Sequence, residues 1–100
     1  MKRVFCSVGS APFNTIIPEV ILQQGLQRVP EAATADIVVS DDRALVERHV
    51  AADAAKIGIF CLPGRPAPGS RFHTRTAVLS FTGCQKKLRR NAKTLLTPAR

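Results

Sequence analysis

The sequence predicts one small α/β domain, with a mainly parallel sheet of about four strands and helices packed on it. Short apolar runs rich in Val and Ile alternate with longer segments of helical periodicity along the 100 residues. The apolar content of 45% is sufficient for a folded chain with one core, and the length fits a single domain, residues 1–100. Strands and helices in alternation are typical of parallel strands joined by right-handed crossovers.

The first strand and the first helix are expected in the first quarter of the chain. Residues 3–8 form an apolar run that a Gly-Ser-Ala-Pro turn closes, which predicts a strand. Residues 14–24 predict a helix that Asn14 caps. Pro18 would lie in its first turn, where a missing N–H is tolerated, and Gly25 is a stop signal.

A second strand, a second helix and a third strand follow. The β-branched run at residues 35–40 is typical of a strand that is covered on both faces. Asp41 and Asp42 begin a helix that we expect to end near Ala55. Residues 56–62 predict the third strand.

The last part of the chain predicts a loop, a strand and a helix. Residues 63–76 contain three Pro, two Gly and three Arg, which indicates a basic loop that we expect to be mobile. A strand over residues 77–81 precedes a basic helix over residues 84–96. Thr82 and Gln85 have the spacing of a capping box at the start of that helix. The apolar stripe of the helix consists of Leu88, Ala92, Leu95 and Leu96.

Charge is divided unevenly between the two halves of the chain. Residues 1–53 carry five basic and seven acidic side chains, whereas residues 54–100 carry ten basic and no acidic ones. A segment that repels itself so strongly commonly meets nucleic acid, an acidic membrane surface or an acidic protein. We expect a face that binds phosphates with strong salt dependence and little sequence preference. The predicted contacts of this face are Arg65, Arg71, Arg75, Lys86, Lys87, Arg89, Arg90 and Lys93.

Three acidic residues around the second strand admit two interpretations. Asp36, Asp41 and Asp42 could hold Mg²⁺ or Mn²⁺, which prefer oxygen ligands, at the carboxyl edge of a parallel sheet. Alternatively, Asp41 or Asp42 caps the second helix, and both favour its N-terminal dipole.

Residues 35–62 resemble the later part of a PIN-like nuclease domain, in which an apolar strand that ends in Thr/Ser-x-Asp precedes a helix. Ser40 and Asp42 match that motif. The resemblance implies a three-layer fold and Mg²⁺ or Mn²⁺ at Asp36 and Asp42. The first strand here lacks the Asp with which PIN-like enzymes begin. This difference leaves open whether the chain is an enzyme, and a degenerate, binding-only relative is an equal alternative.

Residues 5–10, Phe-Cys-Ser-Val-Gly-Ser, resemble the start of the IIB subunits of sugar phosphotransferase systems. This resemblance implies a flavodoxin-like domain in which Cys6 is phosphorylated. Backbone N–H groups and a helix dipole at such a junction would activate the thiolate. Ala11 and Pro12 replace the Ser/Thr cluster of that family, and the alternative is that Cys6 is a buried strand residue.

The function that these patterns predict is that of a nucleic-acid-associated accessory or regulatory protein. The alternatives are a phosphotransfer or signalling module that uses Cys6, and an interaction subunit that docks on an acidic protein. We expect a cytoplasmic protein, because Cys6 and Cys61 read as buried free thiols and no apolar run is long enough to span a membrane. An exposed sheet edge could be closed by homodimerisation.

Overall fold

A five-stranded sheet in the order β2-β1-β3-β4-β5 runs through the middle of the molecule, and every pair of neighbouring strands is parallel. The computed structural model describes residues 2–64, 68–69, 71–72, 74–81 and 83–97. The strands are β1 (Arg3–Ser7), β2 (Gln27–Arg28), β3 (Ile37–Ser40), β4 (Ile57–Pro63) and β5 (Thr76–Phe81). This order, which reverses at β1, is that of flavodoxin-like folds and confirms the predicted α/β class.

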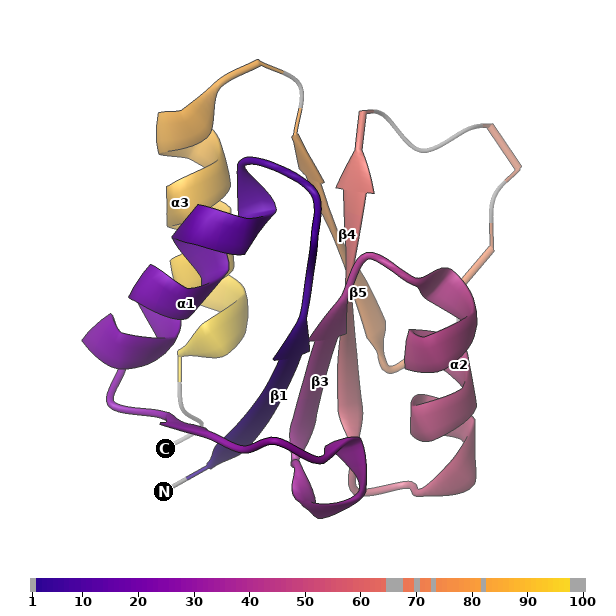
Figure 1. Cartoon of the computed structure of the whole chain (residues 1–100). Helices are drawn as coiled ribbons and strands as arrows, with labels where there is room; N and C mark the ends of the chain where they lie inside the picture. Colours follow the sequence, from indigo (N-terminus) through magenta and orange to yellow (C-terminus); the bar gives the residue numbers. More distant parts are fainter. Residues whose placement is uncertain (1, 65–67, 70, 73, 82, 98–100) are drawn as a thin grey trace.

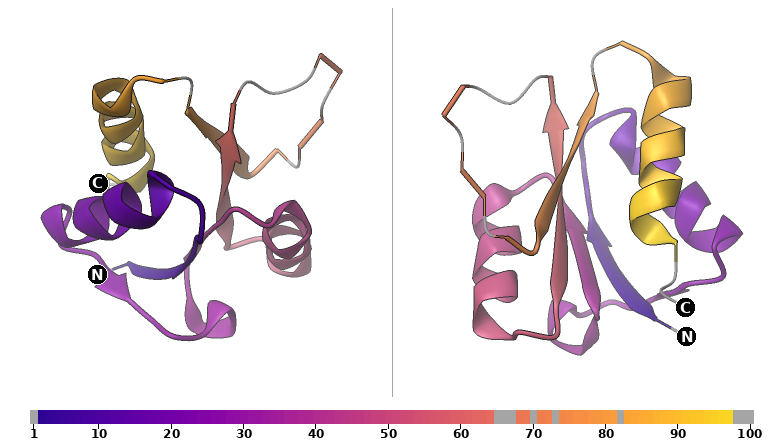
Figure 2. Two further views of the ribbon diagram at one scale, coloured as in Figure 1. Left: turned by 45° about the horizontal axis from the view of Figure 1, so that its top comes forward. Right: turned by 180° about the vertical axis from the view of Figure 1, so that it is seen from behind.

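Three helices cover the sheet and complete a three-layer arrangement. They are α1 (Phe13–Gln23), α2 (Arg43–Ala52) and α3 (Gln85–Leu96). Helices α1 and α3 pack against each other on one face, and α2 lies on the other face against β3 and β4 (Figure 1; Figure 2). Each helix follows the carboxyl end of a strand, so all three begin at the same edge of the sheet.

Two of the connections between strands have no α-helix among their described residues. A short 3-10 helix, η1 (Ala32–Thr34), joins β2 to β3, and residues 64–75 join β4 to β5. Phe72 of the second connection packs on Phe60 of β4, with 5.7 Å between the ring centroids. The guanidinium of Arg43 lies 4.3 Å from the Phe72 ring centroid on α2's side of the sheet. Helix α2 and the aromatic ring of Phe72 therefore both lie against this face of the sheet.

The main hydrophobic core lies between the sheet and the α1–α3 layer, and it is built almost entirely of aliphatic side chains. All four residues of β3 are buried, as the β-branched run predicts for a strand covered on both faces. Leu88, Ala92 and Leu96 of α3 are each about 1% exposed, and Leu95 packs beside them, which confirms the predicted stripe. The strands contribute Val4, Ile37, Val39, Ile59, Cys61 and Leu79, and α1 contributes Phe13, Ile16, Ile17, Val20 and Ile21.

The start of α1 differs from the prediction. Helix α1 begins at Phe13, after Pro12 as its N-cap, and no side chain caps it. Phe13 is fully buried, so core packing draws the helix one residue toward the N-terminus. The predicted cap at Asn14 is therefore wrong, and Pro18 lies inside the helix, beyond the first turn.

Three other boundaries also differ. Strand β2 was not predicted, because its two residues are polar and exposed. Helix α2 ends at Ala52, since Asp53 adopts an extended conformation and its carboxylate accepts the N–H of Ala55 at 2.9 Å. The N-cap of α3 is Cys84, which makes no side-chain capping bond. The predicted capping box is thus wrong in register, and Thr82 lies outside the residues that the structure describes.

None of the helices described here has the length and apolar character needed to cross a bilayer.

Candidate nucleic-acid interface

One side of α3 is a continuous positively charged surface. Lys86, Arg90 and Lys93 follow one another at intervals of four and three residues, so they share a face of the helix, and Lys87 lies beside them. All four side chains are exposed, because the opposite face carries the buried stripe. We call Lys86, Lys87, Arg90 and Lys93 the α3 basic surface.

These four cations have no acidic counterpart in the described part of the chain. None of them forms an ion pair there, whereas six of the seven acidic side chains are engaged in other contacts. Carboxylate oxygens of the six contact backbone N–H groups or basic side chains outside the α3 basic surface. The six are Glu19, Asp36, Asp41, Asp42, Glu47 and Asp53. The positive charge of the α3 basic surface is therefore uncompensated by these carboxylates.

The N-terminus of α3 adds to the positive potential of this surface. Its first turn contains Lys86 and Lys87 and no acidic residue, and Cys84 supplies no side-chain cap. A helix N-terminus carries a partial positive charge, so cations there are electrostatically unfavourable in the isolated protein. A bound anion would relieve that repulsion and meet unsatisfied backbone N–H groups.

Arg89 and Arg75, both predicted as phosphate contacts, have structural partners. The Nε of Arg89 lies 3.1 Å from an oxygen of Glu19, and this half-exposed ion pair joins α3 to α1. The guanidinium of Arg75 donates to the carbonyls of Val50 at 2.5 Å and Asp53 at 2.6 Å. It also donates to the carbonyl of Lys56 at 3.0 Å. Arg75 thus holds the end of α2 against the start of β4, and the chain's own carbonyls occupy its donors.

The other two predicted arginines belong to the connection between β4 and β5. Arg71 is exposed, and its backbone carbonyl accepts a hydrogen bond from the Arg43 guanidinium. Arg65 lies outside the described residues. The structure thus brings together four of the predicted contacts on α3, with Arg89 at their margin.

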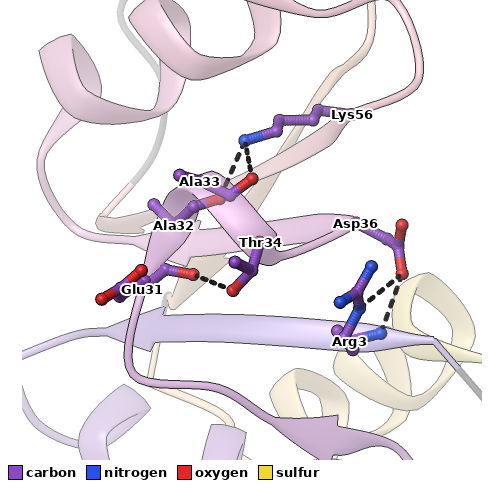
Figure 3. Close-up of polar contacts among 7 residues, drawn as sticks. All are labelled: Arg3, Glu31, Ala32, Ala33, Thr34, Asp36 and Lys56. Carbon is purple, nitrogen blue, oxygen red and sulfur yellow. Dashed lines mark hydrogen bonds and ion pairs between the residues drawn. The ribbon is translucent and has the colours of Figure 1, made fainter.

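The predicted metal ligands Asp36 and Asp42 lie at opposite ends of β3. Asp36 precedes the strand and accepts the backbone N–H of Arg3 at 3.0 Å, with the Arg3 guanidinium 4.0 Å away (Figure 3). Asp42 follows the strand and caps α2, where it accepts the N–H groups of Ala44 and Leu45. The two carboxylates therefore do not form one site. Nor does the described part of the chain hold a group of three His, Cys, Asp or Glu side chains suited to a metal.

Lys56 is a buried cation with a structural task at the same end of the sheet as Asp36. Its ammonium group donates to the carbonyls of Ala32 at 2.8 Å and Ala33 at 3.2 Å (Figure 3). These bonds attach η1 to the start of β4 and satisfy a charge that is only 9% exposed.

Asp41 lies just after β3, next to the loop that follows β1, at the point where the strand order reverses. One of its oxygens accepts the N–H of Gly9 at 3.1 Å and the N–H and hydroxyl of Ser10 at 3.2 and 3.1 Å. Partial desolvation raises the pKa of this carboxyl, but the three hydrogen bonds outweigh it and hold the pKa below its ordinary value. In folds of this order, ligands commonly bind at this point, where the chain's own carboxylate now lies.

Cys6 is half-buried near the end of β1. Burial raises the pKa of its thiol, while the charge of Arg28 and a hydrogen bond from the Val8 N–H oppose that rise and the Asp41 carboxylate adds to it. The net result is a raised pKa, so Cys6 is a thiol at neutral pH. Cys61, buried in β4, has a pKa raised to about 12, chiefly by desolvation.

The sequence predicts only helix capping or metal binding for Asp41, and it does not distinguish Arg75 from the surface cations. The partners of both residues lie far away in the sequence, 31 positions for Ser10 and 25 for Val50. The Asp41-Asp42 pair does carry one signal, since a single N-cap needs one carboxylate and leaves the other for a second partner.

No known protein family matches this chain, and no curated protein or solved structure shows significant similarity to it.

Proposed function

We propose that the protein binds the phosphate backbone of nucleic acid through the α3 basic surface, as an accessory or regulatory factor. The observation that carries this proposal is the set of four exposed cations on one helix face, unpaired within the described chain, while six of the seven acidic side chains contact other groups. A polyanion is the partner that such a surface fits.

The size of the surface suits several phosphates. Lys86 and Lys93 are seven residues apart, which spans about 10 Å of helix at 1.5 Å per residue. Duplex DNA presents one negative charge per about 1.7 Å of its axis, so a segment of this length meets several phosphates at once. Lys and Arg side chains on flexible stems position a protein on the backbone and carry no base information by themselves.

Binding by base stacking is not supported by the ring positions. Phe13 and Phe60 are buried, and Phe5, Phe72 and Phe81 are half-buried. Proteins that stack bases present exposed aromatic platforms beside a basic groove. We therefore expect the protein to contact the phosphate backbone with little sequence preference.

Phosphotransfer through Cys6 is less well supported. Such chemistry needs a thiolate, whereas burial raises the pKa of Cys6. The backbone N–H groups of Gly9 and Ser10, which would stabilise a phosphate in that mechanism, are bonded to Asp41. Docking on an acidic protein uses the same α3 basic surface and is distinguished by experiment.

The test is a fluorescence-anisotropy titration with labelled single- and double-stranded DNA and RNA at two salt concentrations. Four phosphate contacts on a duplex give a slope of log K against log salt of about −3.6, so a fourfold rise in salt should weaken binding by about 150-fold. Replacing Lys86 and Arg90 by Gln should remove about half of that slope, because each cation contributes about −0.9.

A matched control is the double variant Arg28→Gln/Arg48→Gln, which removes the same charge from two exposed residues on β2 and α2. It should keep most of the affinity and the full salt slope. Equal losses in the two double variants would show that net charge alone attracts the nucleic acid. No binding at low salt would refute the proposal and leave an acidic protein as the candidate partner of α3.

A further inference from the structure

A cavity of about 420 Å³ lies on the outer side of β1, and it is lined by Phe5, Cys6, Arg28, Val29 and Pro30. Its origin is the shortness of β2. The N–H of Gln27 donates to the carbonyl of Lys2 and the N–H of Val29 to that of Val4, at 3.1 and 2.9 Å, and the pairing of β2 with β1 ends there. The chain therefore leaves β1 at this point, and η1, which follows, is too short to cover the opening as a full helix would.

The walls of this cavity combine an apolar body with one cationic group. Phe5, Val29 and Pro30 present apolar surface, and Arg28 brings a guanidinium to the rim. Arg28 is exposed and forms no ion pair with any residue described in the structure. Arg28 and Cys6 line the same cavity, and the Arg28 charge opposes the rise that burial causes in the pKa of the Cys6 thiol.

We propose that this cavity binds a small organic carboxylate with an apolar body, with Arg28 as the partner of the carboxylate. The volume lies within the range of roughly 300–1,000 Å³ that is typical of small-molecule sites. Such sites are mostly apolar with a few polar groups that fix the orientation of the ligand. The planar fork of a guanidinium matches the two oxygens of a carboxylate, whereas a phosphate dianion would call for further donors that the walls do not supply.

This site is separate from the α3 basic surface. The cavity lies at the β2 edge of the sheet, whereas α3 packs on α1 and on β5, the strand at the opposite edge. Loss of one function therefore leaves the other measurable, and the two proposals fail independently.

The experiment compares 4-phenylbutyrate with its neutral amide, 4-phenylbutanamide, in titrations followed by the backbone amide shifts of the full chain. We expect 4-phenylbutyrate to shift the backbone N–H signals of Phe5, Cys6 and Val29. The neutral 4-phenylbutanamide should bind far more weakly. Arg28→Gln should weaken the binding of 4-phenylbutyrate about tenfold. Arg48→Gln, which replaces an exposed arginine on α2, should leave this affinity unchanged.

Alkylation of Cys6 provides a second measurement. Cys84 is exposed and would react first, so the assay uses Cys84→Ser, in which Ser is also a favourable N-cap for α3. Bound 4-phenylbutyrate should slow modification of Cys6, and Arg28→Gln should abolish that protection. Three results would each overturn the proposal. They are backbone shifts that map away from the cavity, equal affinities for 4-phenylbutyrate and 4-phenylbutanamide, and an Arg28→Gln variant that binds 4-phenylbutyrate as tightly as the wild type does.

Discussion

Asp41 and Ser10, 31 residues apart, are joined by two hydrogen bonds to one carboxylate oxygen, from the N–H and from the hydroxyl of Ser10. The same oxygen accepts the N–H of Gly9. This oxygen links the loop after β1 to the loop after β3 at the edge of the sheet where all three helices begin. The contact thus lies at the point of the sheet where folds of this strand order commonly bind ligands.

Replacing Asp41 by Asn should lower the free energy of unfolding by about 1–3 kcal/mol, because three donors lose a charged acceptor. Urea unfolding at neutral pH measures this loss. Glu31→Gln is the matched control, since the exposed Glu31 side chain makes no hydrogen bond or ion pair with a residue in the described ranges, and its change should stay within about 0.5 kcal/mol.

The contribution of Asp41 should also depend on pH. Its pKa is lower in the folded protein than in the unfolded chain, so its stabilisation is present above the ordinary Asp pKa of about 3.9 and is lost as pH falls through the folded value. The difference between wild type and Asp41→Asn should therefore shrink below about pH 4. A difference that stays constant in acid would contradict the role of the charged carboxylate.

We expect Asp42 to act as the N-cap of α2 and not as a metal ligand. Asp42→Ala should cost about 0.5–2 kcal/mol, because the N–H groups of Ala44 and Leu45 lose their acceptor, whereas Asp42→Asn should be nearly neutral. Thermal unfolding with and without Mg²⁺ distinguishes this role from metal binding. A Mg²⁺-dependent rise in melting temperature that Asp42→Asn abolishes would restore the metal interpretation.

Gly58 allows α2 to pack closely on β4. A Cβ at this position would lie 2.5 Å from Cγ1 of Val46 and 2.6 Å from Cγ2 of Val50, both on α2. We expect Gly58→Ala to destabilise the protein by about 1–3 kcal/mol through overpacking. Gly9→Ala is the control, since the nearest atom to its Cβ would be 3.9 Å away. If both variants unfold at the same urea concentration, α2 moves away from the sheet without cost.

The sequence predicts the alternation of strands and helices well because each buried element carries its own local signal. The β-branched run of β3 and the stripe of Leu88, Ala92 and Leu96 are examples, and both are buried as expected. Strand β2 has no such signal, since Gln27 and Arg28 are polar and pair over only two residues. Local patterns cannot specify an element that exists only because a neighbouring strand edge is available.

Candidate site residues are harder to predict, because charge counting treats all cations alike. Lys86 and Arg90 lie on an exposed helix face, which the helical period of the sequence itself indicates. Arg75 has the same charge but lies against three carbonyls that are 19 to 25 positions away. Which arginine remains free for a partner depends on the tertiary structure.

Arg75 and Arg90 should therefore separate stability from binding. Arg75→Gln removes the donors that hold the carbonyls of Val50, Asp53 and Lys56, and should lower the free energy of unfolding by about 1–3 kcal/mol. Arg90→Gln should change stability by less than about 0.5 kcal/mol, since its side chain is exposed, yet it should weaken nucleic-acid binding and reduce the salt slope by about 0.9. Urea unfolding measures the stability of both variants, and fluorescence anisotropy measures their binding of nucleic acid. If Arg75→Gln left stability intact and weakened binding as much as Arg90→Gln does, the arginine at the end of α2 would belong to the interface after all.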